Sequence, residues 1–238
     1  MRSHIDTNER LWDELARLHA QLPEYGTDVL KTGGVTLRSL ELQLAGSVAQ
    51  KDLLHLQCHF GLDTLSWVRL GARATGIDFS SAALQIARDL SRDTGIAAQF
   101  HCVRVEEAPR VLAPHSFDIV VATYGVLEWI ADLFTWSQNI AYALQPGGSF
   151  LLIDNHPLTT VLELKVELSG ASVGLGDYYF EKQPRLCRTN GSYADRTASL
   201  STECNYKWSH TLAEVINALL SAGIRLRAIE EYPFCHYK

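Results

Sequence analysis

Three side chains capable of acid–base chemistry stand in the second half of the sequence. His156 lies in Asp154-Asn155-His156-Pro157, directly after an apolar stretch. An imidazole titrates near neutral pH, so His156 is suited to removing a proton from a hydroxyl or an amine. Tyr193 and Asp195 lie in Gly-Ser-Tyr-Ala-Asp, and we expect them to orient a substrate rather than to deprotonate it. We predict these three as catalytic residues, and the alternative for His156 is that it packs under a lid or caps a turn.

Another acid, Asp78, has surroundings that indicate ligand binding. The apolar run from Leu53 to Leu56 predicts a buried strand, and a helix with its apolar residues on one face begins near Leu62. Residues 72–77 predict a second strand, which ends at Asp78. Strand, turn, helix, strand and acid form the first unit of a doubly wound α/β domain, in which such an acid accepts hydrogen bonds from a ribose.

The turn between the first strand and the helix narrows the class of ligand. A dinucleotide-binding turn has the pattern G-x-G-x-x-G, because a pyrophosphate must approach bare backbone. Gln57, His59 and Leu62 stand where those glycines would be. A pyrophosphate would therefore meet side chains, which disfavours an NAD-dependent oxidoreductase. A ligand with a ribose but no phosphate fits such a turn.

The same turn resembles a known motif. The stretch LLHLQCHFG resembles motif I of class I S-adenosylmethionine-dependent methyltransferases, usually written V-L-D-L-G-C-G-x-G. The chain keeps four positions of that motif, which are Leu54, Leu56, Cys58 and Gly61. It has His55 in place of the acid, and Gln57 and His59 in place of two glycines. The longer stretch LQCHFGLDTLSW is similar to one bacterial subgroup of this family.

The resemblance implies that the cofactor is S-adenosylmethionine and that a definite set of residues holds it. Asp78 would bind the ribose, and the segment Thr123-Tyr124 would pass the sulfur. Glu106 would accept a hydrogen bond from the adenine amine, or else be a solvated acid in a turn. The implied cofactor-binding residues are Gln57, Cys58, His59, Gly61, Asp78, Phe79, Glu106, Thr123 and Tyr124.

The resemblance also implies an enzyme that methylates an oxygen or a nitrogen of a small molecule. The sulfonium methyl group is already activated, so alignment supplies much of the rate. A base is needed only if the acceptor arrives protonated. A non-catalytic module that binds S-adenosylmethionine or a nucleoside is the alternative. The enzyme is favoured because polar side chains from several segments are expected to converge near the methyl group, namely Tyr124, Glu128, Asp154, His156, Tyr193, Asp195 and His210.

The rest of the chain predicts an α/β fold with a doubly wound, mostly parallel sheet in a single domain spanning residues 1–238. Further helices are expected at 8–20, 35–44, 81–93, 133–144 and 212–222, and further strands at 97–105, 117–122, 149–153 and 224–232. The family continues with an antiparallel seventh strand, but no candidate follows Tyr232. We therefore expect either a shortened chain or a sheet that closes differently.

Two regions lie outside this alternation of strands and helices. Residues 1–50 are expected to form a helical cover over the cofactor, or else a packing element on the outside of the sheet. Residues 157–208 show no single strong period and are expected to form a lid over the substrate. A peripheral dimerisation element is the alternative, which leaves a homodimer open. Within this insertion we expect a helix at 161–168 and a β-ribbon formed by 177–182 and 199–208.

Charge and cysteine content exclude several classes of protein. The 238 residues carry a net charge of −6, which argues against nucleic acid and anionic membranes as partners. No apolar run approaches bilayer length, and the first residues lead into a polar helix rather than a secretion signal. The five cysteines form no C-x-x-C pair and the His and Cys spacings match no metal template. We therefore expect no metal site and a cytoplasmic protein with reduced thiols.

Overall fold

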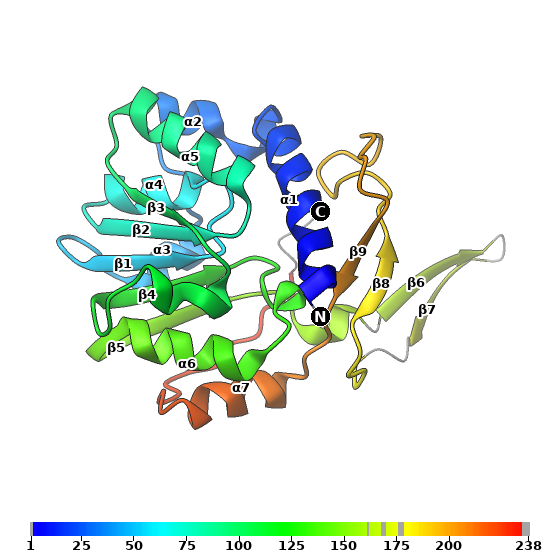
Figure 1. The fold of residues 1–238 in the computed structure, drawn as a ribbon. Coiled ribbons are helices and arrows are strands. Elements are labelled where there is room, and N and C mark those ends of the chain that lie inside the picture. The colour runs from blue at the N-terminus through cyan, green and yellow to red at the C-terminus, as the bar shows by residue number, and fades with distance from the viewer. Residues whose placement is uncertain (1, 161, 168–169, 176–178, 235–238) are drawn as a thin grey trace.

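The computed structural model describes residues 2–160, 162–167, 170–175 and 179–234. Within them, a five-stranded parallel sheet has the strand order β3-β2-β1-β4-β5 (Figure 1). Its strands are β1 (Asp52–Leu56), β2 (Arg73–Asp78), β3 (Gln99–Cys102), β4 (Phe117–Thr123) and β5 (Leu144–Ile153). The order reverses between β1 and β4, and open α/β sheets bind ligands at the carboxyl ends of strands at such a point. The predicted doubly wound fold is confirmed.

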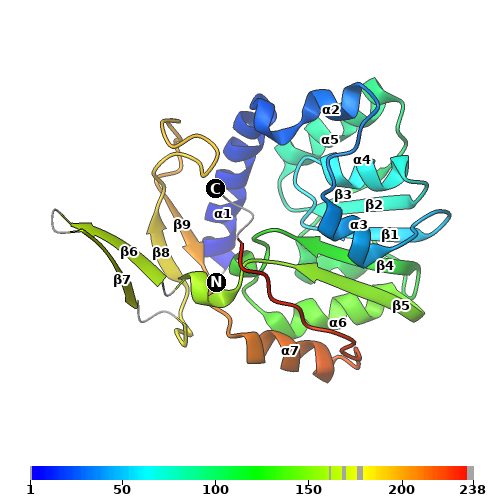
Figure 2. The same cartoon turned by 180° about the vertical axis from the view of Figure 1, so that it is seen from behind.

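Helices cover both faces of this sheet (Figures 1 and 2). One face carries α2 (Thr27–Lys31), α3 (Ser39–Ala45), α4 (Leu62–Arg69) and α5 (Ser81–Thr94), and the other carries α6 (Leu133–Ala143) and α7 (Leu212–Ser221). Successive side chains of a strand point to opposite faces. Leu53 therefore shares a core with Trp67 of α4, whereas Leu54 shares a core with Trp136 of α6.

The helix ends follow the capping signals of the sequence. Ser80 Oγ accepts a hydrogen bond from the Ala83 amide at 3.1 Å, and Gly95, with a φ of 68°, ends α5. Thr211 and Glu214 form the expected capping box at the start of α7. Short 3₁₀ helices connect other elements, namely η1 (Pro23–Tyr25), η2 (Val105–Arg110), η3 (Leu127–Trp129) and η4 (Pro157–Thr160).

The first helix, α1 (Arg2–His19), begins six residues earlier than expected and lies beside the carboxyl ends of the strands (Figure 1). Polar contacts attach it to the sheet domain. Asp13 Oδ1 accepts hydrogen bonds from Ser80 Oγ at 2.6 Å and from the Ala82 amide at 3.0 Å. Arg104 forms an ion pair with Glu9 at 3.0 Å. The helix is thus fixed to the start of α5 and to the segment before η2.

The opposite side of α1 is attached to the insertion. Asn8 bonds the backbone of Tyr206 twice, because its Nδ2 donates to the carbonyl at 2.7 Å and its Oδ1 accepts from the amide at 2.8 Å. Glu14 accepts hydrogen bonds from the backbone amides of Ser201 and Thr202. The helix therefore links the sheet domain to residues far along the chain.

The insertion contains two antiparallel hairpins. β6 (Leu162–Glu167) pairs with β7 (Gly170–Leu175), so the helix predicted at 161–168 is wrong over the described residues 162–167. Those six residues alternate apolar and charged types, which is typical of a strand. β8 (Arg185–Arg188) pairs with β9 (Cys204–Lys207). The second arm of the ribbon, predicted at 199–208, contains β9 and is confirmed. The first arm was predicted at 177–182, but the strand that pairs with β9 begins later, at Arg185. Residues 177 and 178 lie outside the described residues.

The sixth strand predicted at 224–232 is wrong. Over residues 224–234 the described chain runs on from α7 without joining the sheet (Figure 2). Ile224 packs against the core, but Leu226 and Ile229 are 44% and 50% exposed, so the rest of this stretch has no buried face. Within the described residues no antiparallel strand joins the five-stranded sheet. None of the described helices is long and apolar enough to cross a membrane.

The double hydrogen bond of Asn8 provides a test of how α1 is held. Asn8→Ala leaves the amide and carbonyl of Tyr206 without this partner, and each buried polar group left unpaired costs about 1–3 kcal/mol. We expect the free energy of unfolding, measured by urea denaturation, to fall by about 2 kcal/mol or more. Arg10→Ala, an exposed change on the same helix, is the control and should change it by about 0.5 kcal/mol or less. Equal effects of the two substitutions would contradict the attachment of α1 through Asn8.

Candidate functional site

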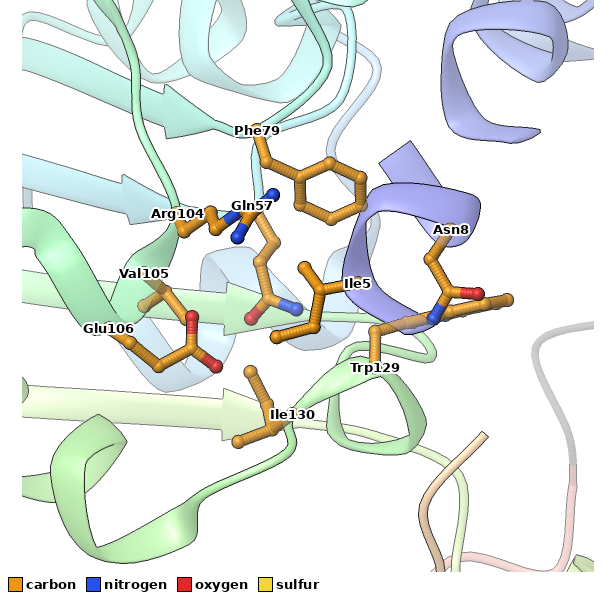
Figure 3. Close-up of a pocket in the computed structure, with 9 residues that line it drawn as sticks. All are labelled: Ile5, Asn8, Gln57, Phe79, Arg104, Val105, Glu106, Trp129 and Ile130. Atoms are coloured by element: carbon orange, nitrogen blue, oxygen red, sulfur yellow. The ribbon is translucent and has the colours of Figure 1, made fainter. Parts of the chain in front are cut away.

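A pocket lies at the carboxyl ends of β1 and β2, against the first turns of α1 (Figure 3). Ile5 and Asn8 of α1 form one wall. Figure 3 shows Phe79, Gln57 and Glu106 extending toward the same space from the sheet side. The lining residues are Ile5, Asn8, Gln57, Phe79, Arg104, Val105, Glu106, Trp129 and Ile130.

The turn after β1 places one polar side chain in this pocket. Gln57 and His59 have φ angles of 50° and 51°, in the left-handed region that few non-glycine residues adopt. Gln57 Nε2 donates to the Val126 carbonyl at 3.1 Å. Gln57 Oε1 is buried and has no hydrogen-bond partner among the described residues. Buried polar atoms are almost always paired, and because Gln57 lines the pocket this oxygen can accept a hydrogen bond from a ligand bound there.

Asp78, the last residue of β2 and the neighbour of Phe79, connects two segments. Its Oδ2 accepts a hydrogen bond from the His59 amide and its Oδ1 accepts one from the Ser80 amide, both at 2.8 Å. Burial raises the pKa of Asp78 from 3.8 to about 6, and the two amides act in the opposite direction. A carboxylate oxygen has two lone pairs, so Asp78 can still accept from hydroxyl groups of a ligand.

Phe79 and Glu106 face the pocket from either side of Gln57 (Figure 3). The segment that carries Glu106 is fixed by Asn139, whose Nδ2 donates to the carbonyls of Val105 and Glu106 at 2.9 Å. Burial raises the pKa of the Glu106 carboxyl. An aromatic ring opposite an acceptor group suits a flat heterocycle that carries an amine.

Two predicted cofactor-binding residues face the protein core. Cys58 is 4% exposed, and a side chain on Gly76 would lie 2.7 Å from its Sγ. Gly61 has a φ of 76°, and a Cβ there would lie 2.8 Å from the Phe100 ring. Both residues therefore shape the turn through packing. A direct contact of either one with a cofactor stays a prediction.

Thr123 is the last residue of β4 and Tyr124 follows it, at the same edge of the sheet. Tyr124 has a φ of 63°, and its amide donates to the Ile153 carbonyl at 2.7 Å. The Arg38 guanidinium lies over the Tyr124 ring, 5.3 Å from the centroid. Burial and the nearby Glu41 carboxylate raise the pKa of Tyr124. Arg38, which directly precedes α3, thus places a cation beside the residue that follows β4.

A second polar group lies where α1, the turn after β1 and the insertion meet. His19 is fully buried, with its Nδ1 3.1 Å from His59 Nε2 and its Nε2 2.6 Å from Ser192 Oγ. Burial lowers the pKa of His19 to about 4. Burial and the neighbouring His19 lower the pKa of His59. Both imidazoles are therefore neutral near pH 7.

Aromatic rings surround this histidine pair and continue to the pocket. Trp12 stands edge-on to His59 and to Trp129, with ring centroids 5.2 Å and 5.3 Å apart. Trp129 also lines the pocket, so the rings form a continuous path from its wall to the insertion. The aromatic cluster consists of Trp12, His19, Tyr25, His59, Trp129 and Tyr193.

The predicted base, His156, has partners at both ring nitrogens. Its Nδ1 accepts a hydrogen bond from the Leu158 amide at 3.1 Å. Its Nε2 lies 2.8 Å from a carboxylate oxygen of Glu231. These contacts are those of a residue that caps a turn, which is the alternative that the sequence left open. The catalytic role of His156 stays a prediction.

The other two predicted catalytic residues have different surroundings. Tyr193 belongs to the aromatic cluster, where its ring centroid lies 4.9 Å from that of His19 and its hydroxyl hydrogen-bonds to the hydroxyl of Tyr25. Asp195 accepts hydrogen bonds from the amide and hydroxyl of Thr197, within its own turn. The structure thus places Tyr193, but not Asp195, beside other side chains that could contact an acceptor.

Three more polar residues that were expected near the methyl group make structural contacts. Asp154 accepts hydrogen bonds from the backbone amides after β4, including that of Leu127 at 2.9 Å. Glu128 receives both of its contacts at 2.9 Å from Lys207, which joins η3 to β9. His210 Nε2 donates to the Ile130 carbonyl at 2.8 Å. These residues hold the loop that contributes Trp129 to the pocket.

The sequence did not single out the contributions of α1 to this region. Ile5, Asn8, Trp12 and His19 recur at helical spacing and lie on one face of α1. The face of the helix that packs against the protein is otherwise apolar. One polar residue and two rings on that face would have indicated a binding function. His19 and Ser192 were missed for another reason, because 173 positions separate them and only the folded chain brings them together.

The groups around the pocket fit the adenosine part of the implied cofactor. Phe79 provides a ring and Glu106 an acceptor in the pocket wall, Asp78 directly precedes Phe79 in the chain, and the buried Gln57 Oε1 has no partner among the described residues. Metal binding has no comparable support, since the described part of the chain holds no group of three or more His, Cys, Asp or Glu side chains that could bind an ion.

Comparisons with known proteins identify the family of this chain. A family model described as a methyltransferase domain matches residues 54–152. The chain is 31% identical to a ubiquinone biosynthesis O-methyltransferase of Methylobacterium, over 74% of this chain and 73% of that protein. It is 30% identical to the protein of the same name from Bordetella pertussis, over 58% of this chain and 53% of that protein.

A solved structure supports the fold. The S-adenosylmethionine-dependent methyltransferase of Mesorhizobium loti superposes with a TM-score of 0.62 at 22% identity, over 81% of this chain and 83% of that chain. At that identity the likeness concerns the fold alone, whereas the Methylobacterium relative shows the family. The chain belongs to the class I S-adenosylmethionine-dependent methyltransferases.

Proposed function

We propose that this methyltransferase methylates a hydroxyl oxygen of a small aromatic molecule. The observation that carries the proposal is the aromatic cluster, which starts at Trp129 in the pocket wall and contains two neutral histidines. Flat rings pack well on aromatic side chains, and a neutral imidazole can take the proton of a hydroxyl. The relatives named ubiquinone biosynthesis O-methyltransferases support oxygen as the acceptor atom.

The pocket residues support an arrangement of the cofactor along the strand ends. The ribose hydroxyls would bind the carboxylate of Asp78, and the adenine would lie against Phe79 with its amine near Glu106. Gln57 Oε1 would accept a further hydrogen bond. The bound cofactor supplies a methyl group activated by the sulfonium charge. The protein's task is then to orient the acceptor, exclude water and receive a proton.

The methionine end of the cofactor would reach Thr123 and Tyr124. Arg38 supports this placement, because its guanidinium over the Tyr124 ring provides a positive charge for the methionine carboxylate. Motif I lacks its usual acid and two glycines in this chain, so a contact from outside the motif would compensate. Cys58 and Gly61 would act indirectly by shaping the turn that carries His59.

Residues 1–50 would cover the cofactor and residues 157–208 would cover the acceptor. The cover is supported by Ile5 and Asn8 in the pocket wall, and the lid by the hydrogen bonds between α1 and β9. We infer a cytoplasmic enzyme for small molecules without a nucleic-acid or membrane partner, in keeping with the net charge of −6. A homodimer through residues 157–208 is a further proposal, which sedimentation of the full chain would test.

A panel of acceptors tests the proposed function directly. Purified protein is incubated with S-adenosylmethionine and matched pairs of catechols, phenols and aromatic amines, and release of S-adenosylhomocysteine is measured. We expect turnover with hydroxyl acceptors and at least about tenfold less with the matched amines. Turnover restricted to amines or to non-aromatic acceptors would contradict the proposal.

The ionisation of Asp78 makes cofactor binding dependent on pH. The ionised carboxylate is the stronger acceptor for ribose hydroxyls, so affinity for S-adenosylhomocysteine should fall as the pH is lowered through about 6. Asp78→Asn should bind at least about tenfold more weakly at pH 7.5, because a charge-assisted hydrogen bond contributes about 1.5–3 kcal/mol. The variant should also lose the pH dependence. Calorimetric titration measures both effects, and a variant with unchanged affinity would contradict the assignment of Asp78.

The raised pKa of Asp78 has the opposite effect on folding: lower pH weakens cofactor binding but increases the free energy of unfolding. Asp78 binds its proton more tightly in the folded chain than at the ordinary pKa of 3.8. Its contribution to folding is therefore complete at low pH and is lost as the pH rises through about 6. Protonation of Asp78 therefore does not unfold the chain near pH 5, and weaker binding of S-adenosylhomocysteine at that pH is expected to come from the site itself. Urea denaturation at pH 5 checks this.

The predicted role of His156 has its own test. If His156 is the general base, His156→Ala should lower turnover by roughly 10²–10⁴. If His156 caps a turn, the variant should be modestly less stable and should keep turnover within about tenfold of wild type. Both ring nitrogens already have partners, so we expect the second result. A loss of turnover of 10²-fold or more with unchanged affinity for S-adenosylhomocysteine would restore His156 as the base.

A further inference from the structure

We propose that Nδ1 of His59 receives the proton of the acceptor hydroxyl, and that His19 and Ser192 hold His59 in the tautomer that this requires. The inference rests on the proposed transfer to oxygen. It assigns a role to the histidine that stands in motif I where a glycine is usual. His19 and Ser192 would act as positioning residues.

The contacts of His59 leave its Nδ1 without a partner among the described residues, and one direction of the hydrogen bonds makes that atom an acceptor. His19 Nε2 lies 2.6 Å from Ser192 Oγ, and that oxygen also accepts from the Ala194 amide at 3.1 Å. If His19 Nε2–H donates to Ser192, its Nδ1 must accept from Nε2–H of His59, 3.1 Å away. His59 then carries its lone pair on Nδ1. That atom is buried and has no hydrogen-bond partner among the described residues.

The position of His59 connects the two halves of the site. Its amide donates to Asp78 Oδ2 at 2.8 Å, so the backbone is fixed at the place proposed for the ribose. Its ring stands edge-on to Trp12, which in turn contacts Trp129 in the pocket wall. The side chain therefore lies between the pocket and the insertion. An acceptor stacked in the aromatic cluster would present its hydroxyl on this side.

The surroundings of the histidine pair keep it neutral until transfer. The polar groups around it are the hydroxyls of Tyr25, Ser192 and Tyr193, and the Asp78 carboxylate, which is engaged by the His59 amide. The lowered pKa values of both histidines follow from burial without a carboxylate partner at either ring among the described residues. A neutral imidazole is available as an acceptor from alkaline pH down to well below pH 6.5.

The transfer balances in atoms and charge. The acceptor oxygen forms a bond to the methyl carbon while the carbon–sulfur bond breaks, and the electron pair of that bond stays on sulfur. The hydroxyl proton moves to His59 Nδ1. One positive charge leaves the sulfur and one appears on the imidazole, so the net charge of the site is unchanged. The hydrogen bond from His59 Nε2 to His19 Nδ1 stabilises the protonated ring.

Nuclear magnetic resonance of the full chain tests the tautomers without any substrate. Protein labelled with ¹⁵N in its histidine rings is measured with S-adenosylhomocysteine, and resonances are assigned from the His59→Asn and His19→Gln variants. Asparagine tolerates the left-handed backbone of residue 59. We expect His59 and His19 to carry hydrogen on Nε2 and bare Nδ1 atoms from pH 8 to pH 6. Hydrogen on Nδ1 of His59 would overturn the proposal.

Turnover separates a proton acceptor from a residue that only shapes the turn. With a catechol, 3,4-dihydroxybenzoate, as the probe, His59→Asn should lower kcat by roughly 10²–10⁴ while the Kd of S-adenosylhomocysteine stays within about threefold. His19→Gln should lower kcat less and give a mixture of His59 tautomers. His101→Asn, a change on β3 outside the aromatic cluster, is the control and should match wild type.

The outcomes distinguish this inference from the proposed function. A His59→Asn variant with full kcat, or one that loses kcat and S-adenosylhomocysteine affinity in parallel, would overturn the role of His59. A wild-type protein that binds S-adenosylhomocysteine but methylates no hydroxyl acceptor would contradict the proposed function. In that case the tautomers measured by resonance would still decide whether His59 presents a bare Nδ1.

Discussion

The site depends on the hydrogen bonds that the buried carboxylate of Asp78 accepts. The backbone amides of His59 and Ser80 donate these hydrogen bonds, which join the turn after β1 to the start of α5. A buried charge needs such donors, because burial alone disfavours it. Through the first of these bonds the residue at 59 is fixed with its ring toward α1. The second places Phe79 at the end of β2, beside the pocket.

The same arrangement makes α1 part of the site as well as of the fold. Asp13 caps the first turn of α5, which begins beside the Asp78 carboxylate, while Asn8 bonds the insertion. Ile5 and Asn8 also line the pocket. The helix therefore cannot be displaced without changing the pocket wall and the contact to β9 together. This coupling accounts for buried polar residues on a face that would otherwise be apolar.

Local patterns predicted the strand ends and three of the nine residues that line the pocket, which are Gln57, Phe79 and Glu106. The alternation of apolar strand and helix placed Asp78, Phe79, Gln57 and Glu106 at one edge, because neighbours in that pattern are neighbours in space. Contacts between distant segments escaped prediction. The partner of His156 at Glu231 and the partner of His19 at Ser192 depend on how the chain returns to the sheet, which residue spacing does not encode.

A crystal structure of the full chain with S-adenosylhomocysteine would test the central claim most directly. The account predicts ribose hydroxyls within hydrogen-bond distance of the Asp78 carboxylate, with the adenine against Phe79 and α1 still bonded to β9. It also predicts that Nδ1 of His59 faces the side from which the acceptor enters. A ligand bound elsewhere, or one at this edge that leaves Asp78 bonded to the His59 and Ser80 amides alone, would contradict it.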